Sequence, residues 1–307
     1  MELHQLEAFA AVARERSFTR ASHRLHLTQP AVTRSVAALE TELRTRLFDR
    51  LGRSVQLTPS GETLLRYAER VLQLTEEAKA AVSDIETGSA GRLSVGASST
   101  LATYLLPPLL ARFRHAHPAV EIAIHTGISA RIRTRVRNGA ADVGLVTSGP
   151  DDDASSSDGA MTVLPLAGLD TCVVLPPLHL LATQRSIDAA TLLSSDLPIL
   201  LMESGTNLRQ YAEAVFGSTV FPAMELDNVE AIKRMIAAGL GFSLLPELAV
   251  RTEVTAGTLA TLPLAVIPQT SGRRIELVYR RDKYLTAPLR RFIALLQSEV
   301  PKLGGRE

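Results

Sequence analysis

The hydrophobic positions near the N-terminus predict two short helices separated by a turn. The apolar face of the first helix consists of Phe18, Ala21 and Leu25, and that of the second of Val32, Val36, Leu39 and Leu43. Leu27 and Thr28 interrupt this spacing between the two faces. We expect Thr28 to cap the second helix, with Gln29 and Pro30 in its first turn, where a missing backbone N–H costs little. The pattern is typical of a helix-turn-helix.

The side of the second helix opposite its apolar face carries polar residues that would enter a DNA major groove. Gln29 has the amide geometry for an adenine edge, whereas Arg34 suits either guanine or a phosphate. Arg50 and Arg53 flank the tip of an expected hairpin wing, from which they would reach a phosphate or the minor groove. A winged helix-turn-helix is therefore predicted over residues 1–58. Its expected DNA contacts are Thr28, Gln29, Pro30, Thr33, Arg34, Arg50 and Arg53.

The distribution of charge supports a nucleic-acid partner better than the total charge does. The whole chain of 307 residues has a formal net charge of +1. Residues 14–58 nevertheless contain nine arginines and four acidic residues, and residues 59–90 reverse this balance with three basic and six acidic residues. A local basic excess attracts the phosphate backbone and makes the affinity depend on salt. The alternative interpretation is a solvated, arginine-rich surface without a partner.

A long helix is predicted over residues 59–87, with Thr58 as its cap and Pro59 in its first turn. Its apolar residues recur at spacings of four and three, which is the 3.5-residue period of a coiled-coil seam. We expect this seam to join two copies of the chain, although an amphipathic helix packed on its own domain would show a similar pattern. The expected dimerisation residues are Leu64, Ala68, Val71, Ala78, Val82 and Ile85. Residues 88–91 would form a hinge to the next domain.

From residue 92 onward, short apolar strands alternate with segments of helical periodicity, which favours an α/β domain with a mainly parallel sheet. Two such sets occur, and the chain returns to the first set through the apolar run at residues 274–279. We therefore expect two subdomains within residues 92–307. The first would comprise residues 92–163 and 265–307, and the second residues 164–264.

Hydroxyl and amide side chains follow the strands of both expected subdomains. In parallel sheets, ligands lie beyond the carboxyl ends of the strands, where helix N-termini present unpaired N–H groups. These turns therefore favour a small anionic ligand, such as a carboxylate, phosphate or sulfate. Each Ser or Thr taken alone could equally be an ordinary helix cap. The expected ligand-binding residues are Ser98, Ser99, Thr100, Thr126, Thr147, Ser204, Gly205, Thr206 and Asn228.

Several of these segments also resemble a known family. Residues 17–61 contain the runs SFTRAS, TQPAVTRSV, LFDR and LTPSG, and residues 225–250 read ELDNVEAIKRMIAAGLGFSLLPELAV. Both are similar to LysR-type transcriptional regulators. The resemblance implies promoter DNA as a partner, a homodimer through the linker helix, and a homotetramer as the common working unit. The run GASSTLATYLLPPLLARF at residues 96–113 is most similar to the branch that regulates carbon dioxide fixation and sulfur assimilation, whose members respond to small or phosphorylated anions.

The fold expected from pattern and resemblance together has two parts. The N-terminal part is an all-α winged helix-turn-helix with a long linker helix. The C-terminal part is an α/β effector domain of two subdomains, similar to periplasmic binding proteins. Two other classes of function stay open at this stage: a ligand-binding module of periplasmic-binding-protein type without a DNA role, and an unrecognised enzyme.

Few residues favour catalysis. The sequence contains no G-x-S-x-G, P-loop, G-x-G-x-x-G or H-E-x-x-H motif. Cys172 is the only cysteine and lies in an apolar strand, where a buried side chain is expected. His115 and His117 are spaced poorly for one metal ion on a helix. We therefore expect no catalytic residue, cofactor or metal ligand.

The lack of a secretion signal and of a long apolar run, together with the single cysteine, favours a cytoplasmic protein without a membrane partner. RNA polymerase stays open as a further partner.

Overall fold

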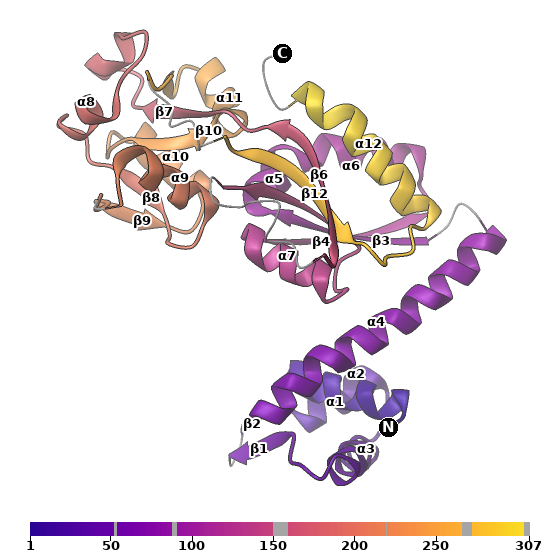
Figure 1. Cartoon of the computed structure of the whole chain (residues 1–307). Helices are drawn as coiled ribbons and strands as arrows, with labels where there is room; N and C mark the ends of the chain where they lie inside the picture. Colours follow the sequence, from indigo (N-terminus) through magenta and orange to yellow (C-terminus); the bar gives the residue numbers. More distant parts are fainter. Residues whose placement is uncertain (52–53, 88–90, 150–158, 219, 266–271, 304–307) are drawn as a thin grey trace. The chain divides into compact units, whose positions relative to one another are not determined.

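The computed structural model describes the chain except for residues 52–53, 88–90, 150–158, 219, 266–271 and 304–307 (Figure 1). For residues 50, 51, 54, 80 and 83–87 it describes the backbone alone. The chain divides into two compact units, Met1–Gly88 and a second that comprises Ser89–Arg137 and Ala141–Glu307. Each unit has a hydrophobic core of its own.

Helices and one hairpin build the N-terminal unit. The elements are α1 (Leu3–Glu15), α2 (Phe18–Leu25), α3 (Gln29–Glu42), β1 (Phe48–Leu51), β2 (Ser54–Leu57) and α4 (Pro59–Thr87). β1 and β2 pair antiparallel, with Phe48 opposite Leu57. The ring of Phe48 lies 5.3 Å from that of the fully buried Phe9 and 5.8 Å from that of Phe18. These aromatic contacts hold the hairpin against α1 and α2, and the predicted winged helix-turn-helix is confirmed.

Local interactions set the two ends of α2 and the start of α3. The Ser17 hydroxyl caps α2 by accepting a hydrogen bond from the Arg20 backbone N–H at 3.3 Å. His26 ends α2 in the left-handed conformation, with a φ of 54°. Thr28 is the N-cap residue of α3, as predicted, but its side chain makes no capping hydrogen bond. The first backbone N–H groups of α3 therefore receive no hydrogen bond acceptor from the Thr28 side chain.

The predicted apolar face of α3 is largely confirmed. Val32, Val36 and Leu39 are all 0% exposed. Leu43 was assigned to the same face, and this was wrong, because it is 39% exposed. The helix ends at Glu42, so Leu43 is the C-cap residue and no longer follows the helical stripe.

The first turn of α4 fits closely against the segment before the hairpin. The Thr58 hydroxyl accepts a hydrogen bond from the Gly61 N–H at 3.0 Å and donates one to the Arg46 carbonyl at 2.8 Å. A Cβ atom at Gly61 would lie 2.1 Å from the carbonyl oxygen of Leu47. Only glycine lets the backbone of α4 approach Leu47 this closely.

We therefore expect Gly61→Ala to destabilise the N-terminal unit by about 1–3 kcal/mol, the usual cost of overpacking a close contact. Ser60→Ala is the matched control, because Ser60 is exposed one residue earlier in the same turn. Urea unfolding of the full-length protein, followed by far-UV circular dichroism, measures both. Equal midpoints for the two variants would show that the turn tolerates a side chain.

A five-stranded sheet in the order β4-β3-β5-β12-β6 forms the first lobe of the second unit. β3 (Gly91–Ser98), β4 (Val120–Gly127) and β5 (Val143–Ser148) run parallel, whereas β12 (Arg274–Arg280) and β6 (Met161–Gly168) join antiparallel. α6 (Leu106–Ala116) and α12 (Ala287–Leu303) cover one face, and α7 (Ser129–Arg137) covers the other (Figure 1). α5 (Ser99–Tyr104) follows directly on β3. The carboxyl ends of β3, β4 and β5 therefore meet at one edge of the lobe.

The second lobe combines two small sheets with short helices. β7 (Thr171–Leu175) lies between β10 (Ser243–Pro246) and β11 (Ala260–Leu262) and is antiparallel to both, whereas β8 (Leu200–Met202) and β9 (Met224–Leu226) run parallel. The helices are α8 (Ala189–Leu193), α9 (Asn207–Phe216), α10 (Val229–Ala237), α11 (Glu247–Thr255) and the 3-10 helix η2 (Leu180–Thr183). The predicted α/β domain of two subdomains is confirmed. The prediction of a mainly parallel sheet is wrong for the three strands around β7.

The predicted start of the second subdomain at residue 164 is also wrong, because it falls inside β6. β6 pairs with β12 from Met161 to Gly168. Pro165 lies at a register shift opposite Glu276. Proline has no backbone N–H to donate to a neighbouring strand. This is tolerated at Pro165 because β6 is the last strand of its sheet. The chain therefore leaves the first lobe only after Gly168.

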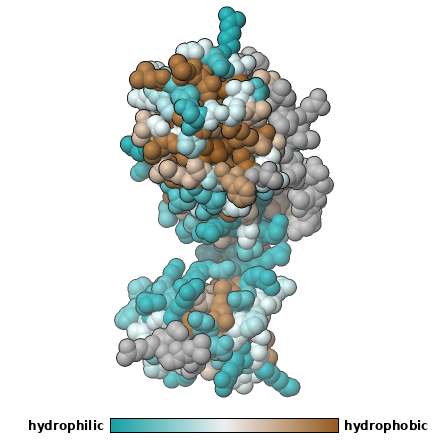
Figure 2. Space-filling model, turned by 90° about the vertical axis from the view of Figure 1, so that its left-hand side faces the viewer, coloured by the Kyte–Doolittle hydropathy of each residue, from teal (hydrophilic) through white to brown (hydrophobic). Residues whose placement is uncertain are grey.

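The two units differ in the surface that Figure 2 shows. Hydrophilic side chains predominate over the N-terminal unit, whereas hydrophobic ones gather over part of the second unit (Figure 2). Leu178, Leu180 and Phe221 of the second lobe are 96%, 84% and 88% exposed. Exposed hydrophobic side chains that gather into a patch often mark a protein contact. None of the described helices is both long enough and apolar enough to cross a membrane.

Candidate functional site

The first turns of α3 present an open polar surface. The exposed residues are Thr28, Gln29, Pro30 and Arg34, and Thr33 is half-buried. The Thr19 hydroxyl donates a hydrogen bond to Gln29 Oε1 at 3.1 Å, which orients the amide and leaves its NH2 group to donate outward. Within the described residues, Arg34 forms no ion pair or side-chain hydrogen bond. An oriented amide and an uncompensated guanidinium thus lie on the solvent side of α3.

The predicted wing contacts are only partly described. Arg53 lies outside the described residues, and so does the side chain of Arg50, whose backbone pairs with Val55. On α2, Arg24 and Arg20 share the carboxylate of Glu15, at 2.8 and 3.7 Å. Exposed ion pairs of this kind are weak and exchange readily for a phosphate.

One apolar face of α4 packs on its own unit. Ala68 is 1% exposed, and Leu64 is half-buried against the same core, together with Leu65 and Leu72. Leu64 and Ala68, which were predicted to begin the dimer seam, therefore pack on the core of their own unit. Their spacing matches that of a seam because the face that docks on the unit lies next to a second apolar face of the same helix.

A second apolar face of α4 is exposed, and we call it the α4 stripe. It consists of Tyr67, Val71, Leu74, Ala78 and Val82. Tyr67, Leu74 and Val82 are 63%, 57% and 61% exposed. Tyr67 and Leu74 were missed in the sequence, because the seam was followed from Leu64. The side chain of Ile85 lies outside the described residues.

A cavity of about 110 Å³ lies between the two lobes of the second unit. The first lobe contributes the carboxyl ends of its parallel strands and the start of α5, and the second lobe contributes the N-termini of α9 and α10. Six of the nine residues predicted to bind a ligand line this cavity. They are Ser98, Ser99, Thr100, Thr147, Thr206 and Asn228.

The other three predicted residues do not line the cavity. Thr126 is exposed, whereas its neighbour Gly127 lines the cavity. Successive residues of a strand point to opposite faces, so the two positions on β4 differ in this way. Ser204 and Gly205 are exposed in the turn before α9, where Gly205 has a φ of 84°. The Ser204 N–H donates to Glu225 Oε1 at 3.4 Å.

Several lining residues were missed in the sequence: Tyr104, Gly127, Ser129, Asn207, Glu230 and Arg273. Ser129 begins α7 after β4, so the same turn rule could have found it. Its hydroxyl contacts Thr147 Oγ1 at 3.1 Å and accepts a hydrogen bond from the Thr147 N–H at 3.2 Å. Arg273 carries no such signal, because an arginine directly before a strand is usually exposed.

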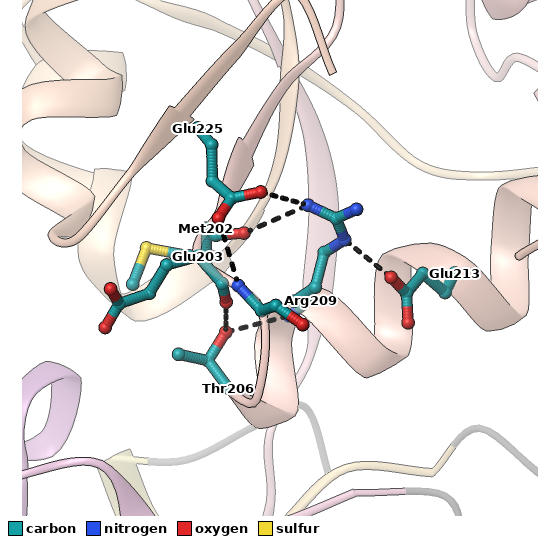
Figure 3. Close-up of polar contacts among 7 residues, drawn as sticks. Met202, Glu203, Thr206, Arg209, Glu213 and Glu225 are labelled. Atoms are coloured by element: carbon teal, nitrogen blue, oxygen red, sulfur yellow. Dashed lines mark hydrogen bonds and ion pairs between the residues drawn. The ribbon is translucent and has the colours of Figure 1, made fainter. Parts of the chain in front are cut away.

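Figure 3 shows how the first turn of α9 is held. Thr206 Oγ1 accepts a hydrogen bond from the Arg209 N–H at 3.2 Å and donates to the Glu203 carbonyl at 3.0 Å (Figure 3). The Arg209 guanidinium binds Glu213 at 2.7 Å and Glu225 at 3.1 Å. Two carboxylates thus compensate Arg209, which leaves little of its charge for a ligand. The Glu203 side chain is exposed outside the cavity lining, so it does not oppose an anion there.

A polar cluster joins the two lobes at the edge of the cavity. The Tyr104 hydroxyl of the first lobe donates a hydrogen bond to Glu230 Oε1 of the second lobe at 2.5 Å. Lys233 Nζ binds Glu230 and Glu253, each at 2.7 Å, and lies 4.9 Å from the centre of the Tyr104 ring. Burial raises the pKa of the Tyr104 phenol above its ordinary value, so it stays a donor. The cluster therefore stabilises the lobes in their present closure.

The cavity offers donors for reversible binding. Its polar lining consists of hydroxyl, amide and guanidinium groups with the carboxylates of Asp227 and Glu230. Cys172 is buried elsewhere, and burial raises the pKa of its thiol to about 12, so it is a poor nucleophile at neutral pH. Across the described ranges, no three His, Cys, Asp or Glu side chains are grouped to hold a metal ion.

Comparison with known proteins covers nearly the whole chain. The family description "Bacterial regulatory helix-turn-helix protein, lysR family" matches residues 3–62, and "LysR substrate binding domain" matches residues 86–301. The chain is 32% identical over 288 residues to the Probable RuBisCO transcriptional regulator of Trichormus variabilis, which covers 92% of this chain and 83% of that protein.

Solved structures share the fold. A variant of full-length OxyR from Pseudomonas aeruginosa has a TM-score of 0.74 at 26% identity, covering 100% of this chain and 98% of its own. Full-length CbnR complexed with its target DNA has a TM-score of 0.66 at 23% identity, covering 97% and 99%.

A winged helix-turn-helix linked to a two-lobed substrate-binding domain defines a DNA-binding transcriptional regulator that responds to a small molecule. The chain belongs to the LysR family of these regulators. A ligand-binding module without a DNA role does not account for the match over residues 3–62, and the similar proteins are named as regulators rather than enzymes.

Proposed function

We propose that α3 reads promoter DNA through Thr28, Gln29, Pro30, Thr33 and Arg34, while Arg50 and Arg53 hold the wing to the DNA backbone. The observation that supports this most is the oriented amide of Gln29 close to the uncompensated Arg34, on a helix whose opposite face is buried. An amide suits an adenine edge and a guanidinium suits guanine. Selection of duplexes from a random library by the full-length protein tests the proposal. It should enrich an interrupted palindrome, and no enrichment would contradict it.

The α4 stripe would join two copies of the chain into the homodimer that such a palindrome requires. Tyr67, Val71, Leu74 and Ala78 repeat at spacings of four and three, as in a coiled-coil seam. Two dimers would form a homotetramer through contacts between their second units. The exposed hydrophobic side chains of the second lobe support a further contact of this kind.

The cavity between the lobes would bind a small anionic effector through Ser98, Ser99, Thr100, Thr147, Thr206 and Asn228. An effector that favours one closure of the lobes shifts the population of that closure, and DNA affinity changes with it. Couplings of this kind usually change affinity about 5- to 150-fold. The hydrogen bond from Tyr104 to Glu230 joins the two lobes, so opening of the lobes would break it.

Thr100→Val should weaken effector binding about 10- to 150-fold, because a hydrogen bond to a charged group would be replaced by a methyl group. Thr183→Val, an exposed threonine in η2, is the matched control. Titration of sulfate, phosphate, phosphorylated sugars and short carboxylates into the full-length protein measures the binding constants by calorimetry. An unchanged constant for Thr100→Val would remove Thr100 from the site.

The names of the relatives support a physiological role for the chain. Their name as RuBisCO regulators supports a role in carbon dioxide fixation, with RNA polymerase as a further partner and the cytoplasm as the location. The proposed domains are residues 1–58 for DNA binding, 59–87 for the linker helix, 88–91 for the hinge and 92–307 for the effector domain. With β6 assigned to the first lobe, its subdomain would comprise residues 92–168 and 265–307.

A further inference from the structure

Arg273 is a buried cation without a carboxylate partner. It is 5% exposed and lines the cavity between the lobes, just before β12. Its Nη1 donates a hydrogen bond to Thr171 Oγ1 at 3.2 Å, and its guanidinium carbon lies 5.9 Å from the centre of the Tyr211 ring. Nε is buried and has no hydrogen-bond partner. Among the described residues, no acidic side chain forms an ion pair with it.

A cation in this state costs stability. A guanidinium carries five N–H donors, and burial without partners forfeits their hydration. Burial accordingly lowers the pKa of Arg273 to about 10, although it stays protonated at neutral pH. The largely buried Arg209 on α9 differs from Arg273, because the carboxylates of Glu213 and Glu225 compensate its charge (Figure 3). A negatively charged ligand would compensate Arg273 in the same way.

A second unpaired group lies in the same cavity. Ser98 is 6% exposed, and its hydroxyl is buried without a hydrogen-bond partner. Three other cavity hydroxyls differ, because Ser129 pairs with Thr147, and Thr206 caps α9. Two buried donors left unpaired in one cavity are a rare combination in folded proteins, where buried polar groups are nearly always bonded.

The size of the cavity limits what could pair with them. Its volume of about 110 Å³ has room for a sulfate, a phosphate or a carboxylate of two or three carbons. The carboxylate of Glu230 is already bound by Tyr104 and Lys233, which weakens its repulsion of such an anion.

We propose that Arg273 and Ser98 bind the anionic group of the effector, and that this group belongs to a small oxyanion. The inference rests on the proposed effector cavity and assigns its charge-recognising residue. Arg273 would supply a planar pair of donors and the compensating charge, and Ser98 one further hydrogen bond. The unpaired cation would be retained because it becomes favourable only when the effector is bound.

Thermal unfolding of the full-length protein tests this with sodium sulfate, phosphate, acetate and pyruvate, each against chloride at constant ionic strength. At least one anion should raise the unfolding temperature of the wild type by several degrees and in a saturable way. Arg273→Met should abolish this rise, while its unfolding temperature without anion equals or exceeds that of the wild type. Arg209→Met is the opposed control: it should unfold earlier, because two carboxylates lose their partner, and keep the response to the anion.

Two outcomes would overturn the assignment. They are an unchanged anion response in Arg273→Met, and no response of the wild type to any of the four anions. Binding of selected operator DNA by the same preparations separates these results from failure of the proposed function. If the wild type binds operator DNA in each case, the DNA-binding function stands and the assignment of Arg273 and Ser98 to a small oxyanion falls.

Discussion

Replacing Arg34 with alanine is expected to weaken operator binding by the full-length protein about 5- to 150-fold, the effect of losing one bidentate contact to a base. Arg34 is exposed on α3 and lacks an ion-pair partner within the described part of the chain, so the substitution removes no contact that holds the fold. Fluorescence anisotropy with a labelled operator duplex measures the loss. Gln29→Ala should act in the same direction, since its amide is already oriented by Thr19.

Arg185→Ala is the matched control for Arg34, because it removes the same charge from an exposed position in the second unit. Its operator affinity should match that of the wild type. The salt dependence adds a second readout, since loss of a phosphate contact lowers the slope of log affinity against log salt by about one and weakens all sequences alike. Equal affinities for Arg34→Ala and Arg185→Ala would exclude Arg34 from the DNA contact.

Replacing Leu74 with lysine is expected to separate the dimer. Leu74 is 57% exposed at the centre of the α4 stripe, so the change should leave the fold of the unit intact while it places a charge in the seam. Joining two binding heads raises overall affinity by about 10²- to 10⁴-fold, and this gain should disappear for an operator with two half-sites. Affinity for a single half-site should stay unchanged. Sedimentation velocity and anisotropy measure the two effects.

Gln73→Lys provides the control for this substitution, because Gln73 lies about 100° round the helix from Leu74 and away from the stripe. It adds the same side chain to the neighbouring position. The protein should stay dimeric and bind the full operator normally. A Leu74→Lys protein that sediments as the wild-type dimer would place the interface elsewhere.

The N-terminal fold could be predicted because local patterns decide it. The apolar positions of α2 and α3 and the prolines in the first turns of α3 and α4 act over a few residues each. The exposed apolar face of α4 was predicted less well. Ala68 and Leu74 are both apolar and periodic, and only tertiary packing decides that the first docks on its own unit and the second is exposed.

The cavity could be predicted in outline for the same kind of reason. The carboxyl ends of parallel strands meet at one edge, so Ser98 and Thr147 come together, and the start of α9 on the second lobe lines the same cavity. Strand β6 was not predicted, because it contains Pro165 and a proline is tolerated only in an edge strand. Arg273 could not be identified as an anion-binding residue from the sequence. That assignment depends on its burial and on the lack of a carboxylate near it among the described residues, and neither is a property of the local sequence.

The central claim is that this chain is a sequence-selective DNA-binding regulator. It is tested most directly by the affinity of the full-length protein for its selected operator and for a scrambled duplex of equal length, at physiological salt. We predict that the operator binds at least about 10³-fold more tightly, the lower end for specific regulators. Equal affinity for the two duplexes would contradict the account.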